Sequence, residues 1–195
     1  SESRGLGDVY KRQVSNLCQK YNSFFHSDAV QAVGHYKIDL NSLKIDFMTS
    51  AGHKFHGPKG VGFTYINNST KIKSFICGGP QERGLRAGTE SVHNIVGMTK
   101  ALEIADKNME EEAQYVKSIK KYLIDNLSNL FPNIHFNGES GDMTNSTYTV
   151  LNVCFPISND KAAMLDFQLD LKGIACSKGS ACPVSYTHLT LPTTD

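Results

Sequence analysis

Short apolar runs separated by turn residues fill the first third of the chain, and they predict a sheet. The runs at 24–28, 45–49 and 61–66 contain aromatic or β-branched residues and have the length of buried strands. The third run is entered through Gly-Pro-Lys-Gly at 57–60, which is a strong turn signal. Asp28 closes the first run, at the strand end where open α/β sheets place ligand-binding groups.

The middle of the chain carries a helical pattern. From Ser91 onward, apolar positions recur at spacings of mostly three, four or seven residues. This pattern predicts a helix that Pro132 stops, with a break near Asn108. The apolar positions are Val92, Ile95, Val96, Leu102, Met109, Ala113, Val116, Ile119, Leu123, Leu127 and Leu130.

Three shorter elements are predicted after this helix. Apolar runs at 148–155 and 174–177 favour strands. Between them, residues 160–171 favour an amphipathic helix, whose initial acid suits the helix dipole. A strand-rich part followed by helix, strand, helix and strand predicts an α/β protein, with two domains joined through the 91–130 segment.

Composition narrows the class of protein only a little. The 195 residues are enough to bury one sizeable core, and the formal charge of +1 gives no indication of nucleic-acid or membrane-surface binding. There is no signal-peptide pattern and no apolar stretch long enough to span a bilayer. Five cysteines, an odd number, favour a reducing compartment over a disulfide framework. We therefore expect a cytoplasmic protein.

Asp28, Gln31 and Lys54 supply the groups that a pyridoxal 5′-phosphate site requires. A lysine amine holds the aldehyde of this cofactor, and a carboxylate keeps the ring nitrogen protonated so that the ring accepts electrons. The predicted strands place Asp28 and the loop with Lys54 at neighbouring ends of the sheet. An alternative remains open, in which Asp28 caps a helix, Gln31 is a surface amide and Lys54 is a solvated lysine.

Cys182 is the candidate reactive thiol, because the small residues before it permit an exposed loop. A cysteine attacks only as its thiolate; Lys178 nearby either favours this form or is simply solvated. Cys176 lies in an apolar run, and we expect it to be a buried structural thiol; the other three cysteines are expected to be structural or incidental. No short C-x-x-C pair is present, so the sequence predicts no metal site.

Four ordered motifs resemble those of the cysteine desulfurases, pyridoxal-phosphate enzymes of fold type I within the class V aminotransferase family. The motifs are His-Ser-Asp-Ala-Val-Gln-Ala-Val-Gly at 26–34, Ala-Gly-His-Lys-Phe-His-Gly-Pro-Lys-Gly at 51–60, Gly-Gly-Pro-Gln-Glu-Arg-Gly-Leu-Arg-Ala-Gly-Thr at 78–89 and Cys-Ser-Lys-Gly-Ser-Ala-Cys at 176–182. Four motifs in one order are far more specific than any one of them. The resemblance runs from about residue 14 to Cys182.

The resemblance implies a role for each matching position. Lys54 matches the Schiff-base lysine, and Asp28 matches the carboxylate on the ring nitrogen. Gln31 matches the amide that contacts the phenolic oxygen of the ring. Gly52 and His53 precede the lysine in the same motif, and His53 matches a residue at the cofactor phosphate. Cys182 matches the cysteine that attacks the sulfur of the substrate.

The glycine-rich motif implies a second subunit. Thr89 matches a threonine that reaches the phosphate of the neighbouring subunit's cofactor, so a homodimer is implied. Arg83 and Arg86 in this loop are either solvated or reach an anion across that interface. One position departs from the family pattern: the serine that usually donates to the phosphate is Ala51 here. Either Ser50 replaces it or the phosphate loses a donor.

The implied fold is α/β, with part of the fold type I large domain (a mixed sheet with helices) at 14–108. Part of the smaller C-terminal α/β domain follows at 109–182. The implied reaction converts L-cysteine to L-alanine and leaves sulfur on Cys182 as a persulfide. This sulfur passes to an acceptor such as an Fe–S scaffold protein, or serves thiolation. The alternatives are selenocysteine lysis, transamination, a small thiol-carrying binding domain and an inactive fragment.

The two ends of the chain are unlike the rest. Residues 8–13 can be encoded by GATGTGTATAAGAGACAG, and the reverse complement of this DNA, read in a shifted frame, encodes residues 183–189. The ends resemble translated transposon adapters from sequencing-library preparation, so we expect 1–13 and 183–195 to be artefacts. The natural part, 14–182, is then expected to be an internal, inactive piece of a longer enzyme. A natural basic arm and a β-like tail are the alternative.

Overall fold

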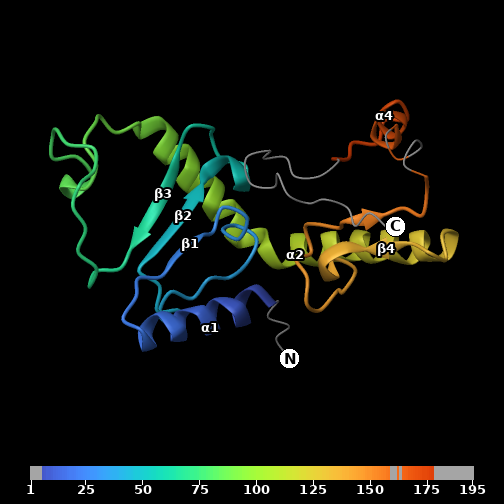
Figure 1. Ribbon diagram of the computed structural model, residues 1–195. Coiled ribbons are helices and arrows are strands. Elements are labelled where there is room, and N and C mark those ends of the chain that lie inside the picture. Colours follow the sequence, from blue (N-terminus) through green and yellow to red (C-terminus); the bar gives the residue numbers. More distant parts are fainter. Residues whose placement is uncertain (1–5, 159–161, 163, 178–195) are drawn as a thin grey trace.

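The computed structural model describes residues 6–158, 162 and 164–177 (Figure 1). A three-stranded sheet is followed by one long helix and by a small two-stranded sheet. The elements in chain order are α1 (Leu6–Lys20), β1 (His26–Asp28), β2 (Phe47–Ala51), η1 (Gly52–Phe55), β3 (Gly62–Ile66), η2 (Glu82–Gly84), α2 (Val92–Leu130), β4 (His135–Phe136), η3 (Asn137–Glu139), β5 (Val153–Cys154) and α4 (Leu165–Asp170).

Strands β1, β2 and β3 form the larger sheet in that order. β1 pairs with β2 in parallel, with Asp28 opposite Thr49, and β2 pairs with β3 in antiparallel register. The three predicted strands and the mixed sheet are confirmed, with strand ends shifted by no more than two residues. Because β1 and β2 run in the same direction, their carboxyl ends lie at one edge of the sheet. Asp28 and the loop after β2 share this edge.

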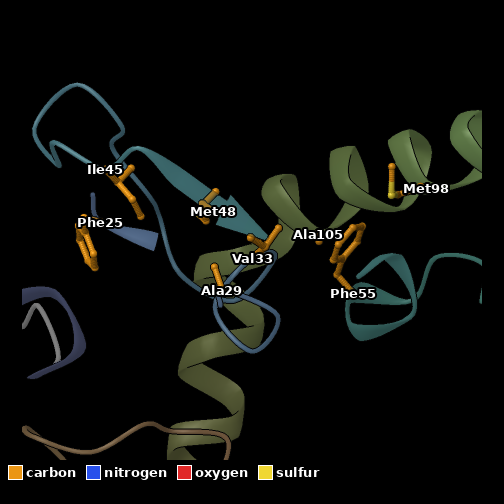
Figure 2. Packing of buried hydrophobic residues seen from close by; sticks show 8 residues of the cluster. All are labelled: Phe25, Ala29, Val33, Ile45, Met48, Phe55, Met98 and Ala105. Atoms are coloured by element: carbon orange, nitrogen blue, oxygen red, sulfur yellow. The ribbon is translucent and has the colours of Figure 1, made fainter. Parts of the chain in front are cut away.

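One face of this sheet carries the hydrophobic core. In β2, Met48 and Ser50 are buried while the residues between and beside them are half-buried, as the two-residue period of a strand requires. Met98 and Ala105 of α2 pack into the same cluster (Figure 2). The cluster consists of Phe25, Ala29, Val33, Ile45, Met48, Phe55, Met98 and Ala105.

Helix α1 packs against the rim of this core. Val14 and Cys18, one helical turn apart, contact the cluster. The buried Ser15 donates its hydroxyl hydrogen to the carbonyl oxygen of Lys44 at 3.0 Å. The helix begins at Leu6, so it crosses the boundary at residue 13 that the coding pattern of the ends predicts. A helix does not test the origin of its DNA, and that boundary stays a prediction.

Helix α2 is continuous over 39 residues. The predicted break near Asn108 is wrong, because residues 104–113 contain neither proline nor glycine and include several strong helix formers. Most of the apolar positions that defined the helix are at least partly exposed, and its buried residues are Met98, Ala105 and Lys120. Among the described helices, none is long and apolar enough to cross a membrane.

Helix α2 connects the two sheets (Figure 1). Near its start, a Cβ added to Gly97 would lie 2.9 Å from Cγ of Pro58, so the helix touches the turn after η1. Further along, Lys120 donates hydrogen bonds to Ser146 and Thr147, which precede β5. This arrangement agrees with two parts joined through the 91–130 segment, although the domain boundary at 108 stays a prediction.

The small sheet is shorter than the sequence indicates. Only Val153 and Cys154 of the predicted strand at 148–155 form a strand, and they pair with β4. Tyr148 is not in a strand; its hydroxyl bonds to the main chain of His35, 113 residues away. A long-range contact has therefore overridden the local strand propensity.

The last described residues also differ from expectation. Helix α4 lies within the predicted helix at 160–171, part of which falls outside the described residues. The predicted strand at 174–177 is wrong, because these residues follow Gly173 in a left-handed conformation (φ 75°) and have no regular structure. Cys176 is exposed, so its assignment as a buried thiol is also wrong. An apolar run becomes a strand only where a partner strand is available.

Candidate functional site

Asp28 ends β1 and lies exposed at the carboxyl edge of the sheet. The next amide, of Ala29, donates to the carbonyl oxygen of Thr49 at 2.9 Å, which ties the end of β1 to β2. The carboxylate oxygen Oδ1 of Asp28 accepts a hydrogen bond from the amide of Val30 at 2.9 Å. The alternative reading of Asp28 as a cap is therefore correct in part. The second carboxylate oxygen is not needed for this cap.

Gln31 lies in a helical turn directly after Asp28. The amide of Val33 donates to the carbonyl oxygen of Ala29 at 3.0 Å, which closes the first turn, and Tyr36 closes the next onto Ala32 at 2.9 Å. Gln31 is exposed while Ala29 and Val33 are buried, so this turn is anchored by its apolar side. The segment 29–36, called the Gln31 turn below, thus holds an exposed amide three residues after Asp28.

Gly52, His53 and Lys54 form η1 directly after β2. Gly52 is buried, and a Cβ added to it would meet Met98, Pro58 and Val61 at 3.1–3.3 Å. His53 and Lys54 are exposed, so η1 is packed at Gly52 and presents its polar side chains to solvent. Within the described residues, no ion pair involves Lys54 or Asp28. The amine is therefore available for a ligand.

Parallel pairing of β1 with β2 brings five of the seven predicted site residues to one edge: Asp28, Gln31, Gly52, His53 and Lys54. Thr89 is not among them. It is exposed on the loop before α2, and the 67–91 segment leaves the sheet from the end of β3 at Ile66, which pairs with Phe47 at the opposite edge (Figure 1). Cys182 lies outside the described residues.

Ser50 does not take the place of the missing serine. Its side chain is 6% exposed and points to the core face of β2, with Met48. Its hydroxyl has no hydrogen-bond partner among the described residues. Ala51 and Thr49 lie on the opposite face, the one that carries Asp28 through its pairing with Thr49. Of the two readings of Ala51, the structure therefore favours the loss of a phosphate donor.

These residues fit pyridoxal 5′-phosphate, except that Ala51 offers no hydroxyl to the phosphate. An exposed amine and an exposed carboxylate at adjacent strand ends match the aldehyde and the ring nitrogen, and the packed glycine allows close approach of the main chain. The phosphate has His53 nearby and no hydroxyl at position 51.

Three residues with perturbed pKa values, Lys120, Asp142 and Tyr148, lie away from this edge, and the sequence did not single them out. Burial lowers the pKa of Lys120, while the charge of Asp142 acts in the opposite direction. Burial, and then the charges of Tyr36 and Glu112, raise the pKa of Tyr148 to about 12. The sequence offered one signal for Tyr148, its place in an apolar run, and none for Lys120, whose burial only the structure shows.

Comparison with known proteins places the chain in a family. The family described as "Aminotransferase class-V" matches residues 9–194. The chain therefore belongs to the class-V aminotransferases, which are enzymes and generally depend on pyridoxal 5′-phosphate. The match covers parts of both terminal segments and does not test whether they derive from adapters.

Cysteine desulfurases are among the most similar relatives. The chain is 42% identical over 171 residues to "Cysteine desulfurase IscS" of Clostridium botulinum, covering 88% of this chain and 42% of that protein. It is 38% identical over 175 residues to the protein of the same name in Dictyoglomus turgidum, covering 89% and 43%. A solved structure called a NifS-like protein matches with a TM-score of 0.76 at 37% identity, covering 86% and 45%. The chain thus spans less than half the length of these relatives.

Proposed function

We propose that this chain is part of a cysteine desulfurase that uses pyridoxal 5′-phosphate to convert L-cysteine to L-alanine. The observation that carries the proposal is the parallel β1–β2 pairing, which sets Asp28 beside the loop that bears Lys54. The identity to curated desulfurases supports the substrate, and the four motifs lie within the region 9–194 that matches the family. The cofactor supplies an electron sink for the electrons released at the α-carbon of the substrate.

Each residue at the edge of the sheet has a defined task in this proposal. The Lys54 amine would hold the cofactor and, as a free amine, would move a proton at the α-carbon of the substrate. The Asp28 carboxylate keeps the ring nitrogen protonated, and its bond from Val30 fixes its orientation. Gln31 donates to the phenolic oxygen, and His53 lies at the phosphate.

Cys182 receives the sulfur. Its thiolate attacks the substrate sulfur and a sulfur–sulfur bond forms. The carbon–sulfur bond of the substrate breaks, its electron pair stays with the β-carbon, and this carbon takes up a proton, so that alanine and a Cys182 persulfide result. The persulfide sulfur then passes to an acceptor such as an Fe–S scaffold protein. Thr89 acts on the cofactor of a second copy of the chain, in line with its place on a loop that leaves the opposite edge of the sheet.

The test uses the complete gene product that carries this sequence, loaded with pyridoxal 5′-phosphate. Lys54→Ala is expected to lose the visible absorption band of the lysine-linked cofactor and all sulfide release from L-cysteine. Lys59→Ala, an exposed lysine of the neighbouring turn, is the matched control and should retain both. Cys182→Ala is expected to keep the band and lose sulfide release. Sulfide release at the wild-type rate from Cys182→Ala would refute the assigned thiol. Selenide release from L-selenocysteine without sulfide release from L-cysteine would refute the proposed substrate.

A further inference from the structure

Tyr148 joins the C-terminal part of the chain to the Gln31 turn. Its side chain is 7% exposed, and its hydroxyl donates a hydrogen bond to the carbonyl oxygen of His35 at 2.9 Å. Its ring lies 5.2 Å from that of Tyr36 and 6.5 Å from that of His35. Both partners are in the segment 29–36, within five residues of Gln31.

The segment around Tyr148 is held in place on α2. Lys120 is 5% exposed, and its Nζ donates hydrogen bonds of 2.7 Å to the Ser146 hydroxyl and to the Thr147 carbonyl oxygen. The ammonium of Lys117 lies 5.8 Å from the centre of the Tyr148 ring. A second hydrogen bond between the same two segments joins the Tyr36 and Thr147 hydroxyls at 2.7 Å. Tyr148 is therefore fixed on the side of the long helix.

The Gln31 turn is pressed against the loop that carries Lys54. Gly34 is left-handed (φ 82°), and a Cβ at this position would lie 2.6 Å from Cβ of Phe55. Phe55 is 1% exposed and follows Lys54 directly in η1. A displacement of the turn at His35 would thus move Gln31 relative to Lys54, because the two elements meet at a contact with no free space.

We propose that Tyr148 is a positioning residue, which couples the C-terminal part of the chain to the Gln31 turn and thereby sets Gln31 and Asp28 against Lys54. The coupling stands on the hydrogen bond and the ring contacts that join Tyr148 to the Gln31 turn; its effect on the cofactor rests on the proposed function. A purely space-filling tyrosine would need only its ring, whereas this coupling needs the hydroxyl. Tyr148→Phe separates the two, since it keeps the ring and removes the bond to His35.

The experiment uses the complete gene product and two readouts. The first is hydrogen exchange without cofactor: Tyr148→Phe should speed exchange of the Val33 and Tyr36 amides by roughly fivefold, as expected from loss of one hydrogen bond. The second is the pH midpoint of the visible band of the lysine-linked cofactor, which should shift by about half a unit. Tyr115→Phe, on the exposed side of α2 (67% exposed), is the control and should change neither.

The outcomes separate the coupling from the proposed function. Wild-type exchange in Tyr148→Phe would overturn the coupling, and faster exchange with an unchanged midpoint would overturn the positioning of the cofactor. If the wild-type protein forms no visible band with pyridoxal 5′-phosphate, the proposed function fails, and the exchange rates alone then decide the coupling. If Tyr148→Phe does not fold, Thr147→Val removes the neighbouring bond to Tyr36 and is judged by the same readouts.

Discussion

Two neighbouring residues of β2 show how strongly one position in a strand changes the chemistry. Ser50 and Ala51 are adjacent, yet Ser50 is enclosed in the core and Ala51 faces the side of the sheet that carries Asp28. A serine one position too early therefore cannot act for the missing hydroxyl. It also leaves a buried hydroxyl without a hydrogen-bond partner among the described residues, which costs about 1–3 kcal/mol.

Ala51→Ser is expected to tighten the binding of pyridoxal 5′-phosphate about tenfold. The new hydroxyl would donate to a phosphate oxygen, and a hydrogen bond to a charged group contributes about 1.5 kcal/mol. Titration of the protein with the cofactor, followed by the quenching of tyrosine fluorescence or by the visible band, measures the change.

Ser50→Ala is the control for this experiment. It should leave the affinity for the cofactor unchanged and raise the free energy of unfolding by about 1 kcal/mol, because the unpaired hydroxyl is removed. A loss of affinity in Ser50→Ala would show that this serine serves the phosphate after all.

At the scale of elements, the site depends on how the Gln31 turn meets η1. Gly34 is buried and left-handed, and the space for its side chain is filled by Phe55. Gly60 is also left-handed (φ 80°), but no heavy atom lies within 4 Å of a Cβ added there. Alanine variants at the two positions thus separate two costs in the free energy of unfolding: that of an alanine in a left-handed conformation, and that of a steric clash with Phe55.

Gly34→Ala is expected to lower the free energy of unfolding by about 3 kcal/mol, of which overpacking against Phe55 supplies roughly 2 kcal/mol. Gly60→Ala should lower it by about 1 kcal/mol through backbone strain alone. Urea denaturation of both variants measures the difference. Equal losses for the two would mean that the turn and η1 are not in firm contact.

At the scale of the whole molecule, α2 supports both parts of the chain. Its buried Met98 and Ala105 face the core of the larger sheet, and its buried Lys120 holds the segment before β5. Tyr148 closes this arrangement by its bond to His35. The contact also gives stability a dependence on pH, because burial and the charges of Tyr36 and Glu112 raise the pKa of Tyr148 to about 12.

The raised pKa of Tyr148 fixes the direction in which stability changes with pH. The folded protein holds the phenol proton more tightly than the unfolded chain, so this stabilisation is complete below pH 10 and is lost as pH rises toward about 12. The free energy of unfolding of the wild type should fall more steeply across this range than that of Tyr148→Phe. Urea denaturation at several pH values measures both slopes. Equal slopes would show that Tyr148 is not held as described.

The sequence alone was sufficient for the main sheet, for the extent of the long helix and for the family. The three strands of the main sheet, the long helix and the set Asp28, Gln31, Gly52, His53 and Lys54 were all predicted, because periodicity and motifs are properties of neighbouring residues. The roles of these residues, and those of Thr89 and Cys182, stay predictions that await experiment.

The tertiary structure decided the rest. It showed that Ser50 faces away from Asp28, that residues 174–177 form no strand, and that Tyr148 bonds to His35 instead of extending β5. Each of these outcomes depends on groups far away along the chain, and Tyr148 and His35 are 113 residues apart. Local propensity carries no information about such partners, since the free energy of a contact depends on what the fold brings next to it.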